Sequence, residues 1–114
     1  SMGGMHTLMI SANYPDLFNY IGLYSAGVDF TKIDMEAIPA YANLDGKLTK
    51  LAQSNPKLYW IACGDADRLM PFNKQLMERM TASGLKYTFH ESRRGHLWSN
   101  WRQYSLLFIP QLFK

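Results

Sequence analysis

Short apolar runs alternate with segments of helical periodicity along this chain, and this alternation limits the folds open to it. The strongest run, residues 57–63 (Lys-Leu-Tyr-Trp-Ile-Ala-Cys), is rich in β-forming side chains and ends at Gly64. Shorter strand patterns occupy residues 20–24 and 86–91. Strands separated by helices are typical of parallel sheets with right-handed crossovers. The sequence therefore predicts an α/β fold with about three parallel strands alternating with helices.

The helical pattern appears in three segments. Residues 2–14 repeat apolar side chains at helical spacing, and so do residues 71–83 and a segment from about residue 98 to Pro110. Residues 28–55 are only weakly periodic. For them we expect an irregular segment with one or two short helices, one of them around 47–54.

Length and charge restrict the classes of partner. The chain has 114 residues, 47% of them hydrophobic, which suffices for one modest core and is too short for two ordinary domains. The formal net charge is +3, without the long basic stripe that favours nucleic-acid binding. No apolar run reaches the length of about 18 residues that a membrane span needs. We therefore expect neither nucleic acid nor a membrane as a partner.

Cysteine and histidine usage argues against a metal site. The only cysteine, Cys63, rules out an internal disulfide and a cysteine-rich zinc site. It ends the strongest apolar run, so we expect a buried, inert thiol. His6 is expected to pack on the flank of the first helix, and His90 to point outward from its strand. Together with His96 they lack metal-ligand spacing, so no metal is expected.

Residues 1–4 (Ser-Met-Gly-Gly) match the second half of a nucleophile elbow. In the G-x-S-x-G form, the serine occupies a strained strand-to-helix turn, and glycines give the backbone room. That motif requires an acid and then a histidine further along the chain. Asp67 follows the strongest strand, and His96 lies in the loop after the next one. Active groups of open α/β sheets gather beyond the carboxyl ends of strands, so Ser1, Asp67 and His96 are a candidate catalytic triad.

Several alternatives stay open at this point. Ser-Met is also what some tag-removal steps leave at an N-terminus, in which case the serine would be accidental. An N-terminal serine can use its own amine as the base, but Asp67 and His96 would then have no role. Asp65 directly follows Gly64 and competes with Asp67 for the acid role, although it could merely stabilise the turn.

The motifs together resemble the putative-esterase family of α/β-hydrolases. This family includes esterase D (S-formylglutathione hydrolase), feruloyl and acetyl-xylan esterases, enterochelin esterases and mycolyltransferases. The resemblance covers nearly the whole chain and is strongest to the bacterial feruloyl-esterase branch. It is carried by residues 1–4 with His6-Thr7, by Ile61-Ala-Cys-Gly64-x-x-Asp67, by Gly95-His96-x-Trp98-x-x-Trp101-Arg102, and by Phe108-x-Pro110-x-Leu112-Phe113.

The resemblance implies a role for each site residue. Ser1 would be the nucleophile, His96 the general base, and Asp67, chosen over Asp65 by the Gly-x-x-Asp spacing, the group that orients the imidazole. The backbone N–H of Met2 would be one oxyanion donor. Trp98 is expected to pack on its helix face, like Trp101, and is also a candidate wall of the acyl pocket.

The resemblance also implies an activity that needs no cofactor. We expect a serine carboxylic-ester hydrolase that forms an acyl-enzyme and acts on feruloyl or acetyl-xylan esters of plant polysaccharide. The alternatives are an esterase D-like S-formylglutathione hydrolase or an acyltransferase. An alternative of another class is a non-catalytic relative that binds carbohydrate or protein. The feruloyl-esterase branch would favour a secreted or periplasmic location, and the esterase D branch a cytoplasmic one.

In the family, the second oxyanion donor comes from the N-terminal half, which is not in this sequence. Loss of one such donor typically costs about 10²–10³ in rate, so we expect weak catalysis from this polypeptide alone. Residues 1–114 are therefore expected to form a single partial α/β-hydrolase domain without its N-terminal half. Its bare sheet edge is expected to bind that missing half or another copy of the chain.

Overall fold

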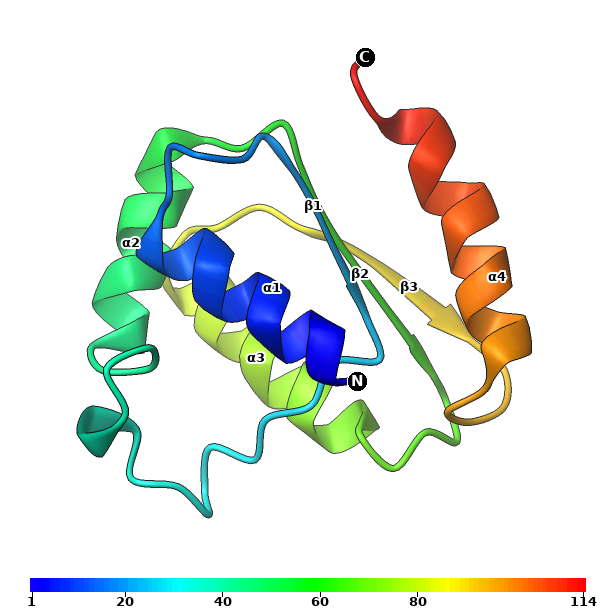
Figure 1. Cartoon of the computed structure of the whole chain (residues 1–114), viewed down its shortest axis with the longest axis horizontal. Coiled ribbons are helices and arrows are strands. Elements are labelled where there is room, and N and C mark those ends of the chain that lie inside the picture. The colour runs from blue at the N-terminus through cyan, green and yellow to red at the C-terminus, as the bar shows by residue number, and fades with distance from the viewer.

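A central parallel sheet of three strands organises the chain, as a computed structural model describes it for residues 1–114. The strands lie side by side in chain order, and helices precede, separate and follow them (Figure 1). The elements are α1 (Met2–Asn13), β1 (Tyr20–Tyr24), a 3₁₀ turn (Met35–Ala37), α2 (Leu44–Ser54), β2 (Leu58–Gly64), α3 (Met70–Ala82), β3 (Thr88–Ser92), α4 (Trp98–Phe108) and a final 3₁₀ turn (Ile109–Gln111).

The middle strand, β2, explains why the apolar run at 57–63 does not alternate. It pairs in parallel with β1 on one side and with β3 on the other. Helices cover both faces of the sheet, so residues 59–64 are all buried. Strands of parallel sheets are typically apolar on both faces for this reason. Strand β1 has no neighbour on its other side and forms a free edge of the sheet.

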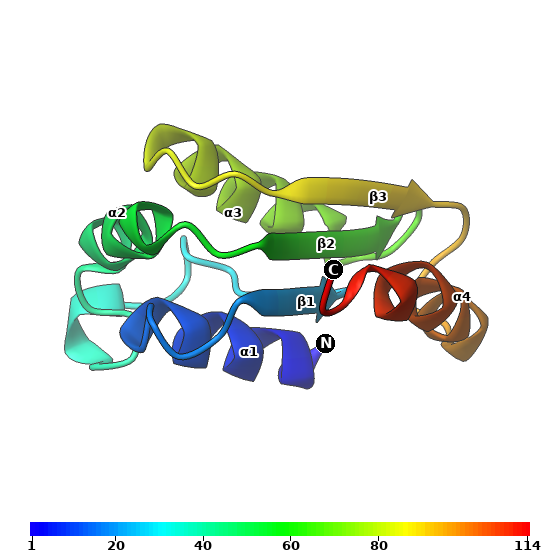
Figure 2. The ribbon, with the colours of Figure 1, turned by 90° about the horizontal axis from the view of Figure 1, so that it is seen from above.

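The two faces of the sheet have separate cores. Helices α1, α2 and α3 cover one face, while α4 lies alone on the other (Figure 2). The larger core contains Leu8, Leu48 and Met80 from the three helices, packed against Leu23 and Ile61 of the sheet. The smaller core is aromatic and is centred on Trp60, Ala62 and Tyr104. The result is a three-layer arrangement in which α4 alone covers the second face.

The predicted elements agree closely with the observed ones. All three strands and three helices lie within a few residues of their expected positions. The helix expected around 47–54 begins earlier, at Leu44. Its start is hard to recognise because only Leu44, Leu48 and Leu51 are buried, so the apolar stripe is one residue wide. None of the helices has both the length and the apolar character needed to cross a membrane.

Candidate active site

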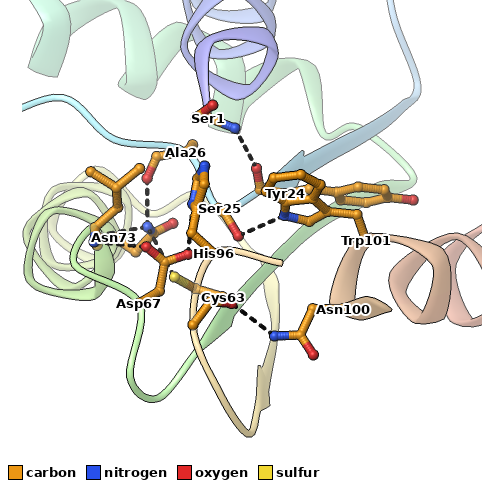
Figure 3. A network of polar contacts seen from close by, with 12 residues as sticks. Ser1, Tyr24, Ser25, Ala26, Cys63, Asp67, Asn73, His96, Asn100 and Trp101 are labelled. Atoms are coloured by element: carbon orange, nitrogen blue, oxygen red, sulfur yellow. Dashed lines mark hydrogen bonds and ion pairs between the residues drawn. The ribbon is translucent and has the colours of Figure 1, made fainter. Parts of the chain in front are cut away.

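The candidate site residues gather at the carboxyl end of the sheet. All three strands point the same way, so the loops that follow them meet at one edge. Asp67 lies in the loop after β2, His96 in the loop after β3, and Ser1 directly before α1. The close view shows the three residues together, with the His96 ring between Asp67 and Ser1 (Figure 3).

Asp67 and His96 are in direct contact. The Nδ1 atom of His96 lies 2.9 Å from Oδ2 of Asp67. The other carboxylate oxygen accepts a hydrogen bond from the backbone N–H of Leu69, also at 2.9 Å. The side chain of Asp67 is 0% exposed and that of His96 is 17% exposed. Both carboxylate oxygens therefore have a partner, and the acid is fixed in place while the imidazole reaches the surface.

The protein keeps Asp67 ionised in spite of its burial. Burial alone would raise the pKa of Asp67, but the N–H of Leu69 and the hydrogen bond and charge of His96 outweigh it. The pKa of Asp67 consequently lies below its ordinary value of 3.8. A lowered pKa means that the carboxylate stabilises the fold above pH 3.8, and that this contribution is lost as the pH falls through the lowered pKa. At neutral pH, Asp67 can therefore accept the Nδ1 proton of His96.

Backbone contacts hold the acid loop and the histidine loop together. The N–H of Asp65 donates to the carbonyl of Ser92 at 2.8 Å, and the N–H of Ala66 donates to the carbonyl of Arg94 at 3.0 Å. Arg94 has a φ of 70°, in the left-handed region. Gly64 permits the close approach, because a Cβ there would collide with the carbonyl oxygen of Arg94.

Two buried asparagines also hold these loops, and neither was predicted from the sequence. The side-chain amide of Asn100 donates to the carbonyls of Arg93 and Gly95, each at 2.9 Å. The amide of Asn73 donates to the carbonyl of Leu69 at 2.9 Å, beside the acid. Asparagine is a poor helix former, so its presence in two predicted helices was a signal for buried hydrogen bonds.

Ser1 lies at the same end of the sheet but is not hydrogen-bonded to His96. Its backbone nitrogen donates to the carbonyl of Tyr24, at the end of β1, at 3.2 Å. The following helix packs closely on the sheet, because Gly4 has no side chain to collide with Ala26. The N–H of Met2 belongs to the first turn of α1, where helix geometry provides no internal acceptor. It is therefore free to donate to a bound oxyanion.

The competing acid, Asp65, is placed differently from Asp67. Its side chain is exposed and makes no hydrogen bond with His96. Only its backbone takes part in the loop, through the bond to Ser92. Of the two aspartates, Asp67 alone is positioned to orient the imidazole.

The two tryptophans of α4 differ in exposure. Trp98 is 74% exposed, so the expectation that it packs on the helix face is wrong apart from its contact with Trp101. It projects from the first turn of α4, where no element of the chain covers it. Both rings border a hollow of about 500 Å³ on the free edge of β1, lined by Ser1, Gly3, Gly4, Thr7, Gly22, Tyr24, Trp98 and Trp101.

Cys63, His90 and His6 make no contact with the side chains of the candidate triad that would give them a role in it. Cys63 is buried as expected; its burial, followed by the charge of Asp67, raises the pKa of the thiol to about 12, so it stays protonated at neutral pH. His90 does not point outward as expected, because it stacks on Trp60 under α4 with ring centroids 5.9 Å apart. His6 is exposed and makes no hydrogen bond, so the packing role expected for it is wrong as well. No three metal-ligating side chains of the chain form a group that could hold an ion.

Comparison with known proteins gives the same picture of the fold. A family model described as "Putative esterase" matches residues 1–108. The structure is similar to that of a ferulic acid esterase, with a TM-score of 0.74 and 20% identity, over 96% of this chain and 47% of the other. It is also similar to S-formylglutathione hydrolase from Staphylococcus aureus, with a TM-score of 0.68 and 21% identity, over 91% of this chain and 45% of the other.

The chain thus spans about half the length of these two structures. No curated protein matches its sequence. The predicted fold class is confirmed, because three parallel strands alternate with helices and the arrangement is shared with part of two esterases.

Proposed function

This chain belongs to the family described as "Putative esterase", and we propose that it carries the Ser-Asp-His triad of a serine carboxylic-ester hydrolase. The observation that carries the proposal is the contact between His96 and the fully buried Asp67 at 2.9 Å. A buried carboxylate on Nδ1 of a surface-reaching histidine is the arrangement that a general base requires. Ser1 lies on the opposite side of that ring from Asp67 (Figure 3).

The proposed reaction follows from these positions. Asp67 holds the proton of His96 on Nδ1, which leaves Nε2 free to accept a proton. Nε2 takes the hydroxyl proton of Ser1 as Oγ attacks the ester carbonyl carbon. The carbonyl oxygen becomes an oxyanion, to which the N–H of Met2 donates. His96 then returns the proton to the departing alcohol, and water attacks the acyl-enzyme by the same route in reverse.

We further propose an aromatic acyl group as the substrate, of the feruloyl type found in esters of plant polysaccharides. The support is the exposed ring of Trp98, which borders the same hollow as Ser1. A flat, exposed indole can stack on the face of an aromatic acid, a contact that an acetyl or formyl group cannot make. Trp98 would then form one wall of the acyl pocket.

A fluorophosphonate probe tests the proposal, because it reacts covalently with activated serines. We expect mass spectrometry of the labelled protein after proteolytic digestion to find the adduct on the peptide that contains Ser1. A Ser1→Ala variant with an unchanged melting curve is expected to stay unlabelled. An unlabelled Ser1 in a protein shown to be folded would contradict the hydrolase and favour a non-catalytic binding protein.

Competition in the same experiment examines the acyl group. Methyl ferulate is expected to slow the labelling of Ser1 at lower concentration than S-formylglutathione does. The reverse order would contradict the feruloyl assignment and support the esterase D-like alternative. An acyltransferase would be distinguished by faster turnover of methyl ferulate when a second alcohol is added as acceptor.

We also propose that the free edge of β1 pairs with a further strand, either from the part of the esterase fold that this chain does not span or from another copy of the chain. The bond from the Ser1 nitrogen to the Tyr24 carbonyl already runs as a sheet bond would at this edge. A second hollow lies beside the start of β1, and its lining includes the exposed side chains of Leu17, Phe18 and Phe113. We expect light scattering of this polypeptide to show an assembly larger than one chain. A stable monomer would contradict this proposal.

A further inference from the structure

The imidazole of His96 has a second neighbour besides Asp67. The ring of Trp101 meets it edge to face, with centroids 4.8 Å apart and planes at 85°. A single hydrogen bond at Nδ1 fixes one point of the imidazole but leaves the ring free to turn about that bond. The indole packs against the imidazole at nearly a right angle and so restricts this turning.

Trp101 is itself tied to the sheet at a distant point of the chain. Its indole N–H donates to the hydroxyl of Ser25 at 3.1 Å, across 76 residues of sequence. Ser25 follows β1 and is 0% exposed, and its own N–H donates to the carbonyl of Ala62 in β2 at 2.8 Å. The anchor of the indole is therefore part of the rigid end of the sheet (Figure 3).

The backbone at Ser25 makes this hydroxyl unusual. Its φ is 47°, in the left-handed region that favours glycine over residues with a side chain. Serine at such a position is less stable than glycine unless its side chain makes a compensating contact. The Ser25 hydroxyl makes that contact with Trp101. The same hydroxyl also helps to lower the pKa of the buried Asp67 carboxyl.

We propose that Trp101, held by Ser25, is a positioning residue that fixes the plane of the His96 ring, so that Nε2 stays directed toward Ser1. The proposal rests on the proposed esterase activity for its kinetic consequences. The restricted motion of the His96 ring can be measured without any substrate. Neither Trp101 nor Ser25 belongs to the triad: Trp101 acts through its contact with the His96 ring, and Ser25 acts through Trp101 and Asp67.

Two variants remove the hydrogen bond from its two ends. Trp101→Phe keeps an aromatic ring and deletes the indole N–H, while Ser25→Gly deletes the hydroxyl and suits the left-handed backbone. Each is expected to lower kcat about tenfold, a part of the 10²–10⁴ that a general base contributes. Ser25 does not line the hollow beside Ser1, so Ser25→Gly is expected to leave KM unchanged. The double variant is expected to fall no further than either single one, because both changes break one unit.

Tyr104→Phe is the matched control on the same helix. It deletes the hydrogen bond between the Tyr104 and Ser92 hydroxyls, 2.6 Å apart, which ties α4 to β3 without contacting His96. We expect its kcat to stay within about twofold of the wild type. An equal loss of kcat in Tyr104→Phe would show that general anchoring of α4 matters, and would overturn the positioning role.

Proton NMR of the Nδ1–H of His96 provides the reading that is independent of activity. In the wild type we expect a sharp downfield resonance, and in Trp101→Phe and Ser25→Gly a broadened one that exchanges faster with water. An unchanged resonance in both variants, or a kcat within twofold of wild type in both, would overturn the proposal. If the fluorophosphonate probe does not label Ser1 in the wild type, the proposed esterase activity is wrong. The NMR comparison of the His96 resonance would still show whether Trp101 and Ser25 fix the ring.

Discussion

Replacing Asp67 with Asn is expected to lower kcat about 10⁴-fold while the fold stays intact. The Asn side chain is nearly the same size and its oxygen can still accept the N–H of Leu69. Its amide, however, would donate to Nδ1 of His96, which forces the ring proton onto Nε2. Nε2 could then no longer take the proton of Ser1. Steady-state hydrolysis of an activated aryl ester measures the loss, and a circular-dichroism melt checks the fold.

Asp65→Asn is the control for this prediction. It makes the same chemical change two residues away, on an exposed side chain that does not contact His96. We expect its kcat to remain within about twofold of wild type, since surface substitutions of this kind are usually near neutral. A loss as large as that of Asp67→Asn would mean that Asp65 supplies the acid, and the assignment of Asp67 would be wrong.

Replacing Gly64 with Ala is expected to have the largest effect on stability. The added Cβ would overlap the carbonyl oxygen of Arg94, which is main chain and cannot turn away as a flexible side chain could. Overpacking typically costs about 1–3 kcal/mol, and a collision with main chain belongs at or above the upper end. We expect urea unfolding to show a free energy of unfolding lower by about 3 kcal/mol or more.

The same substitution should also impair catalysis. The collision pushes apart the loop that carries Asp67 and the loop that carries His96, so their contact would lengthen. Gly3→Ala is the matched control for stability only, because it adds the same methyl group in α1 where nothing beyond its chain neighbours and its own helix backbone lies within 4 Å. Within a helix that change is expected to stabilise by about 0.5–1 kcal/mol. A Gly64→Ala protein as stable as wild type would contradict the packing argument.

Much of this arrangement could be predicted from local patterns. The apolar run at 57–63, the glycine that ends it and the helices on either side are local features, and they recur in the structure within a few residues. The carboxyl-end rule then placed Asp67 and His96 at one edge, since parallel strands align their ends. The contact between these two side chains at 2.9 Å agrees with that expectation.

The expectations that were wrong concerned side chains whose surroundings come from distant parts of the chain. Alternation on a strand placed His90 outward, but α4 covers that face of the sheet and His90 stacks on Trp60 beneath it. Helical spacing placed Trp98 against a core, but it lies at the first turn of α4, beyond the reach of the sheet. Periodicity shows which residues share a face, and it does not show what covers that face.

The sequence by itself determined the strand–helix order and the buried middle strand, because each depends on residues close together along the chain. It also indicated His96 as the candidate base, while the choice of Asp67 over Asp65 as the candidate acid came from the resemblance to the family. Tertiary structure alone decided how the histidine is held. Asn100 hydrogen-bonds to the loop that carries His96, and Gly64 lets that loop approach the loop of Asp67. Trp101, bonded to Ser25 76 residues away, restrains the His96 ring. Such contacts arise only when chain crossings bring remote backbone and side chains together, and no local pattern encodes them.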